Sequence, residues 1–140
     1  MAGPKITLET KDSGVREEFV TGSRRDSRVG KGRYDLISPL ALRRLALVYE
    51  RGAKKYGDHN WVKGQPVGRY VDSALRHILQ YLEGDRTEDH IAQAAWNCFS
   101  IMHTEEAIQR GLLPAELYDL LDLTAPVAAP KEVEDGNALR

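Results

Sequence analysis

The sequence predicts a small all-α helical bundle with an irregular N-terminal arm and a flexible C-terminal tail. In the middle of the chain, apolar residues recur at the three- and four-residue spacings that are typical of amphipathic helices. Residues 1–37 contain several glycines and show no helical period, and residues 124–140 combine Ala, Pro, Glu, Asp and Gly without a period. These observations predict an arm at residues 1–37, a helical domain at residues 38–123 and a disordered tail at residues 124–140.

Composition argues against several classes of protein. The 20 Lys and Arg residues nearly balance the 21 Asp and Glu residues, so a stable nucleic-acid partner is not expected from charge alone. The single cysteine, Cys98, cannot form an internal disulfide, and its place in an apolar helical pattern predicts a buried thiol. No apolar run is long enough for a bilayer, and the N-terminus lacks an apolar signal core. We expect a soluble, cytoplasmic protein without a membrane partner.

The N-terminal arm is locally basic. Ile6 and Leu8 alternate with polar neighbours and predict a short strand. Further along, the arm carries five cations, namely Arg24, Arg25, Arg28, Lys31 and Arg33. Two interpretations remain open: a solvated leader, or a loop that closes over phosphates with its basic side chains and glycine-rich backbone.

The first predicted helix covers residues 39–55. Ser38 and Pro39 match an N-cap and a first helical position, and one apolar face follows at Leu42, Leu45, Ala46, Tyr49 and Ala53. Glu50 lies at the edge of this face and is either a surface charge or a metal ligand. Gly57 ends the helix.

The loop after this helix carries Asn60 and Trp61. Trp61 either caps the core or stacks on a nucleobase whose edge the Asn60 amide contacts. The second predicted helix, residues 69–83, has the strongest apolar period in the chain, at Val71, Ala74, Leu75, Ile78, Leu79 and Leu82. Asp72 and Arg76 are four residues apart on its flank, which suits either a structural ion pair or a functional role.

A turn at Gly84 and Asp85 leads to a third predicted helix that reaches about residue 110. Asp85 or Thr87 is expected to cap it. Apolar residues cover more than one of its sides, yet a polar stripe runs through it at Asp89, Gln93, Asn97 and Ser100. Such a stripe must be partly buried and must find hydrogen-bond partners, which is the best sequence argument for a site. Leucines at 112–123 predict a further short helix, which packs on the bundle or contacts another subunit.

Acidic residues on these elements favour a hard cation. Mg²⁺ and Mn²⁺ take oxygen ligands in proteins, and inward carboxylates of a helical bundle provide them; the candidates are Glu50, Asp72, Glu83, Glu88 and Asp89. The four histidines are widely spaced and do not form a zinc pattern. The sequence also lacks HExxH, GxSxG and GxGxxG motifs.

Several short motifs occur in a fixed order: KGRYDLI at 31–37, KYG at 55–57, NW at 60–61, RH at 76–77, EDH at 88–90 and Asn97. Together they resemble the phage and bacterial dATP/dGTP diphosphohydrolase family, which is related to the MazG-like all-α nucleoside triphosphate pyrophosphohydrolases. The resemblance covers residues 20–112. When the MazG-like pattern is aligned with this chain at the Gly84–Asp85 turn, the chain retains Asp72 in place of an acid of the EExxE motif. In the ExxD motif, Asn97 replaces the acid. The cation has therefore moved to other carboxylates, or activity is altered or lost.

The resemblance implies a nucleotide-binding domain of the all-α pyrophosphohydrolase type. It implies metal-dependent hydrolysis of dGTP or dATP to the monophosphate and pyrophosphate, with Mg²⁺ or Mn²⁺ on the five carboxylates named above. His77 and Asp89 are the implied catalytic residues. The implied substrate-binding residues are Lys31, Arg33, Lys54, Lys55, Asn60, Trp61, Arg76 and Asn97. The resemblance also implies a homo-oligomer, either a dimer or a tetramer.

Two alternatives remain open at this stage. A nucleotide-binding protein without turnover would bind the same ligands but release no pyrophosphate. A small helical DNA-binding or interaction protein would use the basic arm, and its duplex binding would weaken steeply with salt.

Overall fold

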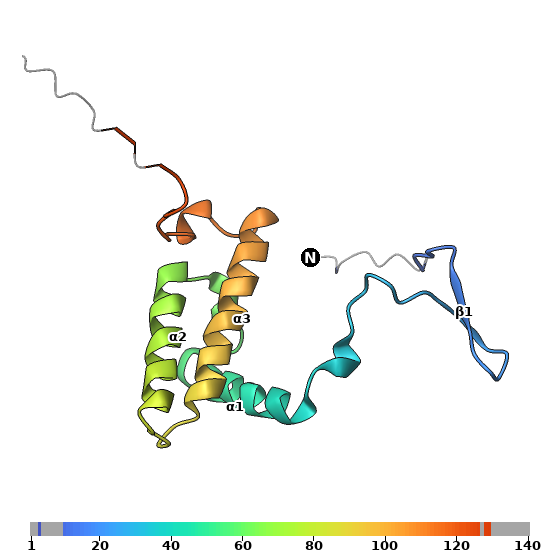
Figure 1. The fold of residues 1–140 in the computed structure, drawn as a ribbon, viewed down its shortest axis with the longest axis horizontal. Helices are drawn as coiled ribbons and strands as arrows, with labels where there is room; N and C mark the ends of the chain where they lie inside the picture. The colour runs from blue at the N-terminus through green and yellow to red at the C-terminus, as the bar shows by residue number, and fades with distance from the viewer. Residues whose placement is uncertain (1–2, 4–9, 127, 130–140) are drawn as a thin grey trace, which may run out of the picture. The chain divides into compact units, whose positions relative to one another are not determined.

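The computed structural model describes residues 3, 10–126 and 128–129. The chain divides into two units, Met1–Ser38 and Pro39–Arg140 (Figure 1). The predicted strand at Ile6 and Leu8 lies outside the described residues, and so does most of the predicted tail. None of the described helices combines the length and the apolar character that crossing a membrane requires.

The N-terminal unit contains a hairpin that the sequence analysis did not predict. Strand β1, Arg16–Glu18, pairs antiparallel with β2, Arg24–Asp26. A short 3₁₀ turn follows at Tyr34–Leu36. The hairpin lacks an apolar alternation because charged side chains hold it: Arg24 pairs with Glu18 at 3.3 Å. The arm is therefore more ordered than predicted, and its structure depends on charges of opposite sign.

The second unit confirms the all-α prediction. It consists of α1 (Pro39–Tyr56), a 3₁₀ turn at Asn60–Lys63, α2 (Val67–Leu82), α3 (His90–Gln109) and a 3₁₀ turn at Ala115–Leu117. Helices α2 and α3 lie side by side along their length, joined by a tight turn (Figure 1). Helix α1 packs against α3. The first two helices lie within two residues of their predicted bounds.

The ends of α3 and the segment after it differ from the prediction. Asp89, rather than Asp85 or Thr87, is the N-cap of α3, because its side chain accepts a hydrogen bond from the Ala92 amide at 3.1 Å. Asp85 instead accepts from the amide and the hydroxyl of Thr87 at 2.8 and 2.7 Å, which shapes the turn. The predicted helix at 114–123 is only the 3₁₀ turn at Ala115–Leu117.

The face of α2 that is buried is not the predicted one. Val67, Tyr70, Ala74 and His77 are buried, whereas Leu75, Leu79 and Leu82 are 57, 56 and 78% exposed. The reason lies in α3, whose buried face is made of small or polar residues. The Ser100 hydroxyl donates to the Trp96 carbonyl at 3.0 Å, and the Thr104 hydroxyl donates to the Ser100 carbonyl at 2.7 Å. Because both hydroxyls have hydrogen-bond partners within α3, these residues can pack as small side chains.

Cys98 is exposed, so the prediction of a buried thiol is wrong. Cys98 lies four residues from Met102, which is 55% exposed, and both belong to the outward face of α3. The apolar period of α3 was read correctly as helical. The polar stripe, rather than the apolar face, packs against α2.

Candidate functional site

A cavity of about 1120 Å³ lies in the helical unit, between the end of α1, the loop that follows it, α2 and the start of α3. Nine residues that the sequence singled out line it: Glu50, Lys54, Lys55, Asn60, Trp61, Arg76, His77, Glu88 and Asn97. A cavity of this size suits a small organic ligand.

Aromatic rings form one side of this cavity. Tyr49 contacts Trp61 with ring centroids 6.2 Å apart and Trp96 with centroids 6.1 Å apart. Trp61 also packs edge-on against His103 at 4.8 Å. Trp61 is therefore a half-buried residue that packs against other rings and also lines the cavity, and stacking on a nucleobase stays a prediction.

Cations line the cavity beside these rings. Arg51, Lys54, Lys55, Arg69 and Arg76 all contribute to its wall. Arg76 donates to the Ser73 hydroxyl and to the side-chain amide oxygen of Gln80, each at 3.4 Å. These bonds are long, so they leave the exposed guanidinium available to an anionic ligand.

The polar stripe of α3 is partly buried and hydrogen-bonded, as the sequence predicted: Asn97 and Ser100 are buried, whereas Asp89 and Gln93 are half-buried. Asn97 is 5% exposed. Its amide donates to the Ser73 hydroxyl of α2 at 3.3 Å and to the Gln93 carbonyl at 2.9 Å. The stripe thus connects α3 to α2 at the cavity wall.

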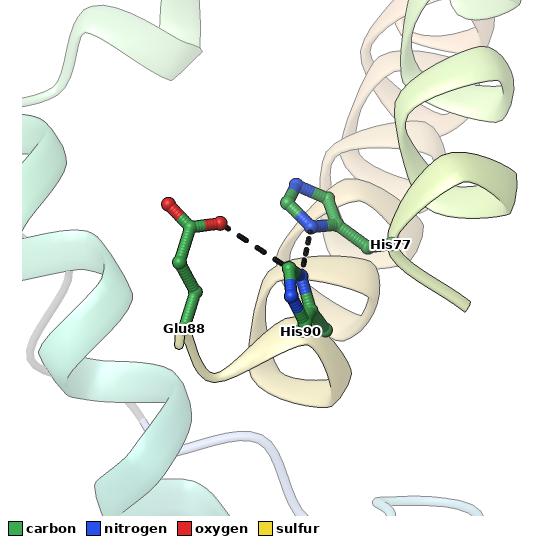
Figure 2. A group of neighbouring side chains, drawn as sticks. All are labelled: His77, Glu88 and His90. Carbon is green, nitrogen blue, oxygen red and sulfur yellow. Dashed lines mark hydrogen bonds and ion pairs between the residues drawn. The ribbon is translucent and has the colours of Figure 1, made fainter. Parts of the chain in front are cut away.

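Two buried histidines and one glutamate meet near the α2–α3 turn (Figure 2). His77 of α2 and His90 at the start of α3 are 4% and 2% exposed. Their Nδ1 atoms are 2.9 Å apart, and Glu88 Oε2 lies 3.8 Å from His90 Nδ1. One potential ligand atom from each residue lies within 4.8 Å of the others, which makes the group a candidate metal site.

The environment favours neutral, metal-binding imidazole at His77. Burial lowers the pKa of His77 from its ordinary value, and the charges of Arg76 and His90 lower it further, while Glu88 raises it. Asp85 lies beside the pair, with its Oδ2 atom 3.1 Å from His90 Nε2. The hydrogen bonds of Thr87 hold the pKa of Asp85 at about 2, so Asp85 is a carboxylate at neutral pH.

The remaining predicted residues lie elsewhere. Asp89 accepts from Arg44 at 2.8 and 2.7 Å, and Asp72 pairs with Arg69 at 3.7 Å. Glu83 is exposed at the end of α2. Lys31 and Arg33 belong to the N-terminal unit, where they pair with Asp26 at 2.6 Å and Asp35 at 2.7 Å. The cavity wall includes none of these five residues.

Sequence reasoning named His77 but missed His90 and Asp85 as parts of one cluster. The wide spacing of the four histidines in sequence indicates only that they do not form a zinc pattern. A signal was present nonetheless: His77 lies seven residues before Gly84 and His90 six residues after it. Because a tight turn makes the two helices antiparallel, residues at similar distances from the turn become neighbours.

The fold and the site define a small all-α protein whose cavity is lined by aromatic rings, cations and two members of a potential metal cluster, His77 and Glu88. Residues 21–111 match the family model described as dATP/dGTP diphosphohydrolase, N-terminal. The match covers more than half of the chain, and the chain belongs to this family. Searches of curated proteins and of solved structures found no match.

Proposed function

We propose that the protein hydrolyses dGTP or dATP to the nucleoside monophosphate and pyrophosphate, with the help of a divalent metal ion. One observation carries the proposal: aromatic rings, cations and two candidate metal ligands, His77 and Glu88, line a single cavity. Each of these groups suits one part of a nucleoside triphosphate, namely the base, the phosphates and the bridging cation. Membership of the family supports the same reaction. We place the reaction in the cytoplasm, or in the host cytoplasm if the gene belongs to a phage.

The proposed substrate contacts follow the cavity wall. The triphosphate lies against Lys54, Lys55 and Arg76, whose charges offset that of the leaving pyrophosphate. The base stacks on Trp61 and accepts or donates a hydrogen bond at the Asn60 amide. Asn97 holds the substrate from the α3 side. Lys31 and Arg33, the predicted contacts of the N-terminal unit, lie within the residues that the family model matches. Because each pairs with an acidic residue of its own unit, we assign them no contact in the cavity.

The residues present fit a divalent cation at the end of the cavity where His77 and Glu88 lie. When bound, such an ion neutralises phosphate charge and lowers the pKa of a bound water. Gln93 donates to Glu88 Oε2 at 3.2 Å and so orients that carboxylate. Of the other predicted carboxylates, Glu50 lines the cavity. We propose that Asp89 acts as a positioning residue, because Arg44 and the α3 amide occupy its oxygens.

Pyrophosphate release tests the proposal. The purified chain is expected to release pyrophosphate from dGTP or dATP only when a divalent metal is present. Arg76→Gln should lower kcat/KM by at least about tenfold, since a charge-assisted contact to phosphate is lost. Lys63→Ala is the control, because Lys63 is an exposed cation of the 3₁₀ turn Asn60–Lys63 and lies outside the cavity wall. Tight nucleotide binding without pyrophosphate release would favour the binding protein instead.

The DNA-binding alternative finds less support in the arm. Arg16, Arg24, Lys31 and Arg33 all form ion pairs with acidic residues of the same unit. A basic surface that is neutralised by its own neighbours attracts little phosphate. Duplex binding that weakens steeply with salt would revive this alternative.

We also propose that the protein forms a homo-oligomer through α2. Three leucines on its outward face, Leu75, Leu79 and Leu82, are each more than half exposed. The predicted interface at 112–123 is only partly available, because Leu113 and Leu117 pack close to Gly64. A second copy of the chain would cover the α2 leucines, as expected for a helical bundle completed by association.

A further inference from the structure

The cluster of His77, Glu88 and His90 bears on which metal ion the protein uses. A cation held only by carboxylates, as the resemblance implies, requires several acids to converge. Asp72 and Asp89 are engaged by Arg69 and Arg44 instead, and Glu83 lies outside the cavity wall. Within the part of the chain that the structure describes, His77, Glu88 and His90 are the group whose potential ligand atoms come together.

Asp85 lies at the outer nitrogen of His90. Its Oδ2 atom is 3.1 Å from His90 Nε2, an electrostatic contact without hydrogen-bond geometry. The other ring nitrogen, Nδ1, lies 2.9 Å from His77 Nδ1 and 3.8 Å from Glu88 Oε2. Histidines that bind metals commonly have a carboxylate beside the ring nitrogen that does not bind the metal. Asp85 occupies that place relative to His90.

The separation of the two nitrogens also fits one ion. Metal–nitrogen bonds to histidine are about 2.0–2.1 Å long, so a single ion can contact two nitrogens as far apart as about 4 Å. The two Nδ1 atoms are 2.9 Å apart. Glu88 is exposed and its side chain can adjust toward the same ion.

The donor set selects a class of ion. Mg²⁺ prefers oxygen ligands and retains its water, whereas imidazole suits borderline transition metals. Two histidines and one glutamate form a common three-ligand set that leaves a position open for water or substrate. We propose that His77, Glu88 and His90 bind a divalent transition-metal ion such as Fe²⁺, Co²⁺ or Zn²⁺ in preference to Mg²⁺, with Asp85 orienting His90.

This inference rests on the proposed function only where it gives the bound ion a part in hydrolysis. Metal binding is measurable without nucleotide, so the two can fail separately. Binding at the cluster without pyrophosphate release would remove the proposed reaction and keep the metal site. Turnover that needs only Mg²⁺ and survives His77→Gln would do the reverse.

Cobalt binding tests the site directly. The full chain, stripped of metal, is titrated with Co²⁺ and followed by visible d–d absorption. We expect saturation at one ion per chain, displacement by Zn²⁺, and no displacement by a large excess of Mg²⁺. Absent cobalt bands, or displacement by equimolar Mg²⁺, would overturn the proposal.

Three variants locate the bound ion. His90→Gln removes a ligand and is expected to weaken Co²⁺ binding by more than about 100-fold, and Asp85→Asn by about 10–100-fold. Glu50→Gln is the matched control, because it removes a cavity carboxylate that an all-oxygen site would use, and it should bind Co²⁺ as the wild type does. The opposite order, with Glu50→Gln weakened and His90→Gln unchanged, would refute the assignment.

A measurement on the wild type covers the case in which a buried histidine variant does not fold. X-ray absorption of the Zn²⁺-loaded protein should show the outer-shell scattering of coordinated imidazole rings. A spectrum with only oxygen neighbours and no imidazole scattering would refute the proposal without any variant.

Discussion

Asp89 was predicted to be a catalytic and metal-binding acid, and the structure gives it several partners of its own. Both of its oxygens accept from Arg44, at 2.7 and 2.8 Å, and one also accepts from the Ala92 amide at 3.1 Å. Asp89 therefore ties α1 to the first turn of α3. Glu88 and His90 are its immediate neighbours in sequence, which is why we propose that Asp89 positions these two candidate metal ligands and is not a ligand itself.

Two substitutions of Asp89 separate the contribution of its N-cap hydrogen bond to stability from the contribution of its charge. Asp89→Ala loses the N-cap bond and the Arg44 pair, and should lower the free energy of unfolding by about 1–2 kcal/mol. Asp89→Asn keeps a capping oxygen and should cost less. Urea denaturation measures both. If Asp89→Asn retains full metal-dependent turnover, Asp89 is not a catalytic residue.

Lowering the pH should reduce the contribution of Asp89 to the stability of the fold. The Arg44 guanidinium holds the pKa of Asp89 at about 2, below its ordinary value of 3.8. A lowered pKa means that the stabilisation is present above the ordinary value and is lost as pH falls through the folded-state value. The stability difference between wild type and Asp89→Asn should thus shrink from about pH 4 to pH 2. A difference that stays constant over this range would contradict the ion pair's role.

At the scale of elements, periodicity predicted three helices but not which faces they bury. The positions of α1 and α2 followed from apolar spacing and from the glycine and proline signals at their ends. The buried face of α2 did not, because its partner face on α3 relies on hydroxyls that bond to their own helix. Such residues read as polar in sequence, yet they pack like small apolar ones.

Gly64 follows the 3₁₀ turn Asn60–Lys63, and a side chain at this position should be poorly tolerated. Its φ is +77°, and a Cβ there would lie 2.8 Å from a methyl of Leu113 and 2.9 Å from one of Leu117. Gly64→Ala should lower the free energy of unfolding by at least about 1 kcal/mol, through backbone strain and a displaced 3₁₀ turn. Gly52→Ala, within α1 and with open space around it, should raise stability by up to about 1 kcal/mol. Thermal or urea unfolding of both variants checks this contrast.

The hairpin and the histidine cluster were beyond sequence reasoning for related reasons. The hairpin depends on cross-strand charges such as Glu17 opposite Arg25, which produce no apolar alternation. The cluster depends on a turn that aligns His77 with His90, and long sequence separation hides such contacts. By contrast, Trp61, Arg76 and Asn97, which the family resemblance names as substrate-binding residues, all line the cavity, and their role there stays a prediction.

At the scale of the whole molecule, the proposed homo-oligomer rests on the exposed leucines of α2. Leu79→Glu should convert the proposed oligomer into monomers, because a charge cannot be buried in an apolar interface without a partner. Light scattering coupled to size-exclusion chromatography measures the mass. Leu47→Glu is the matched control, since Leu47 is similarly exposed, at 53%, but lies on α1. A wild-type protein that is already monomeric at high concentration would rule out the oligomer.

The proposed hydrolysis requires a metal ion and a nucleotide to bind in the same cavity. A crystal structure with Co²⁺ and a non-hydrolysable dGTP analogue tests this most directly, because anomalous scattering locates the cobalt. We expect cobalt bonded to His77 and His90, the phosphates between the metal and Arg76, and the base against Trp61. Cobalt held by Asp72, Glu83 or Asp89, or a nucleotide bound away from Trp61, would contradict the account.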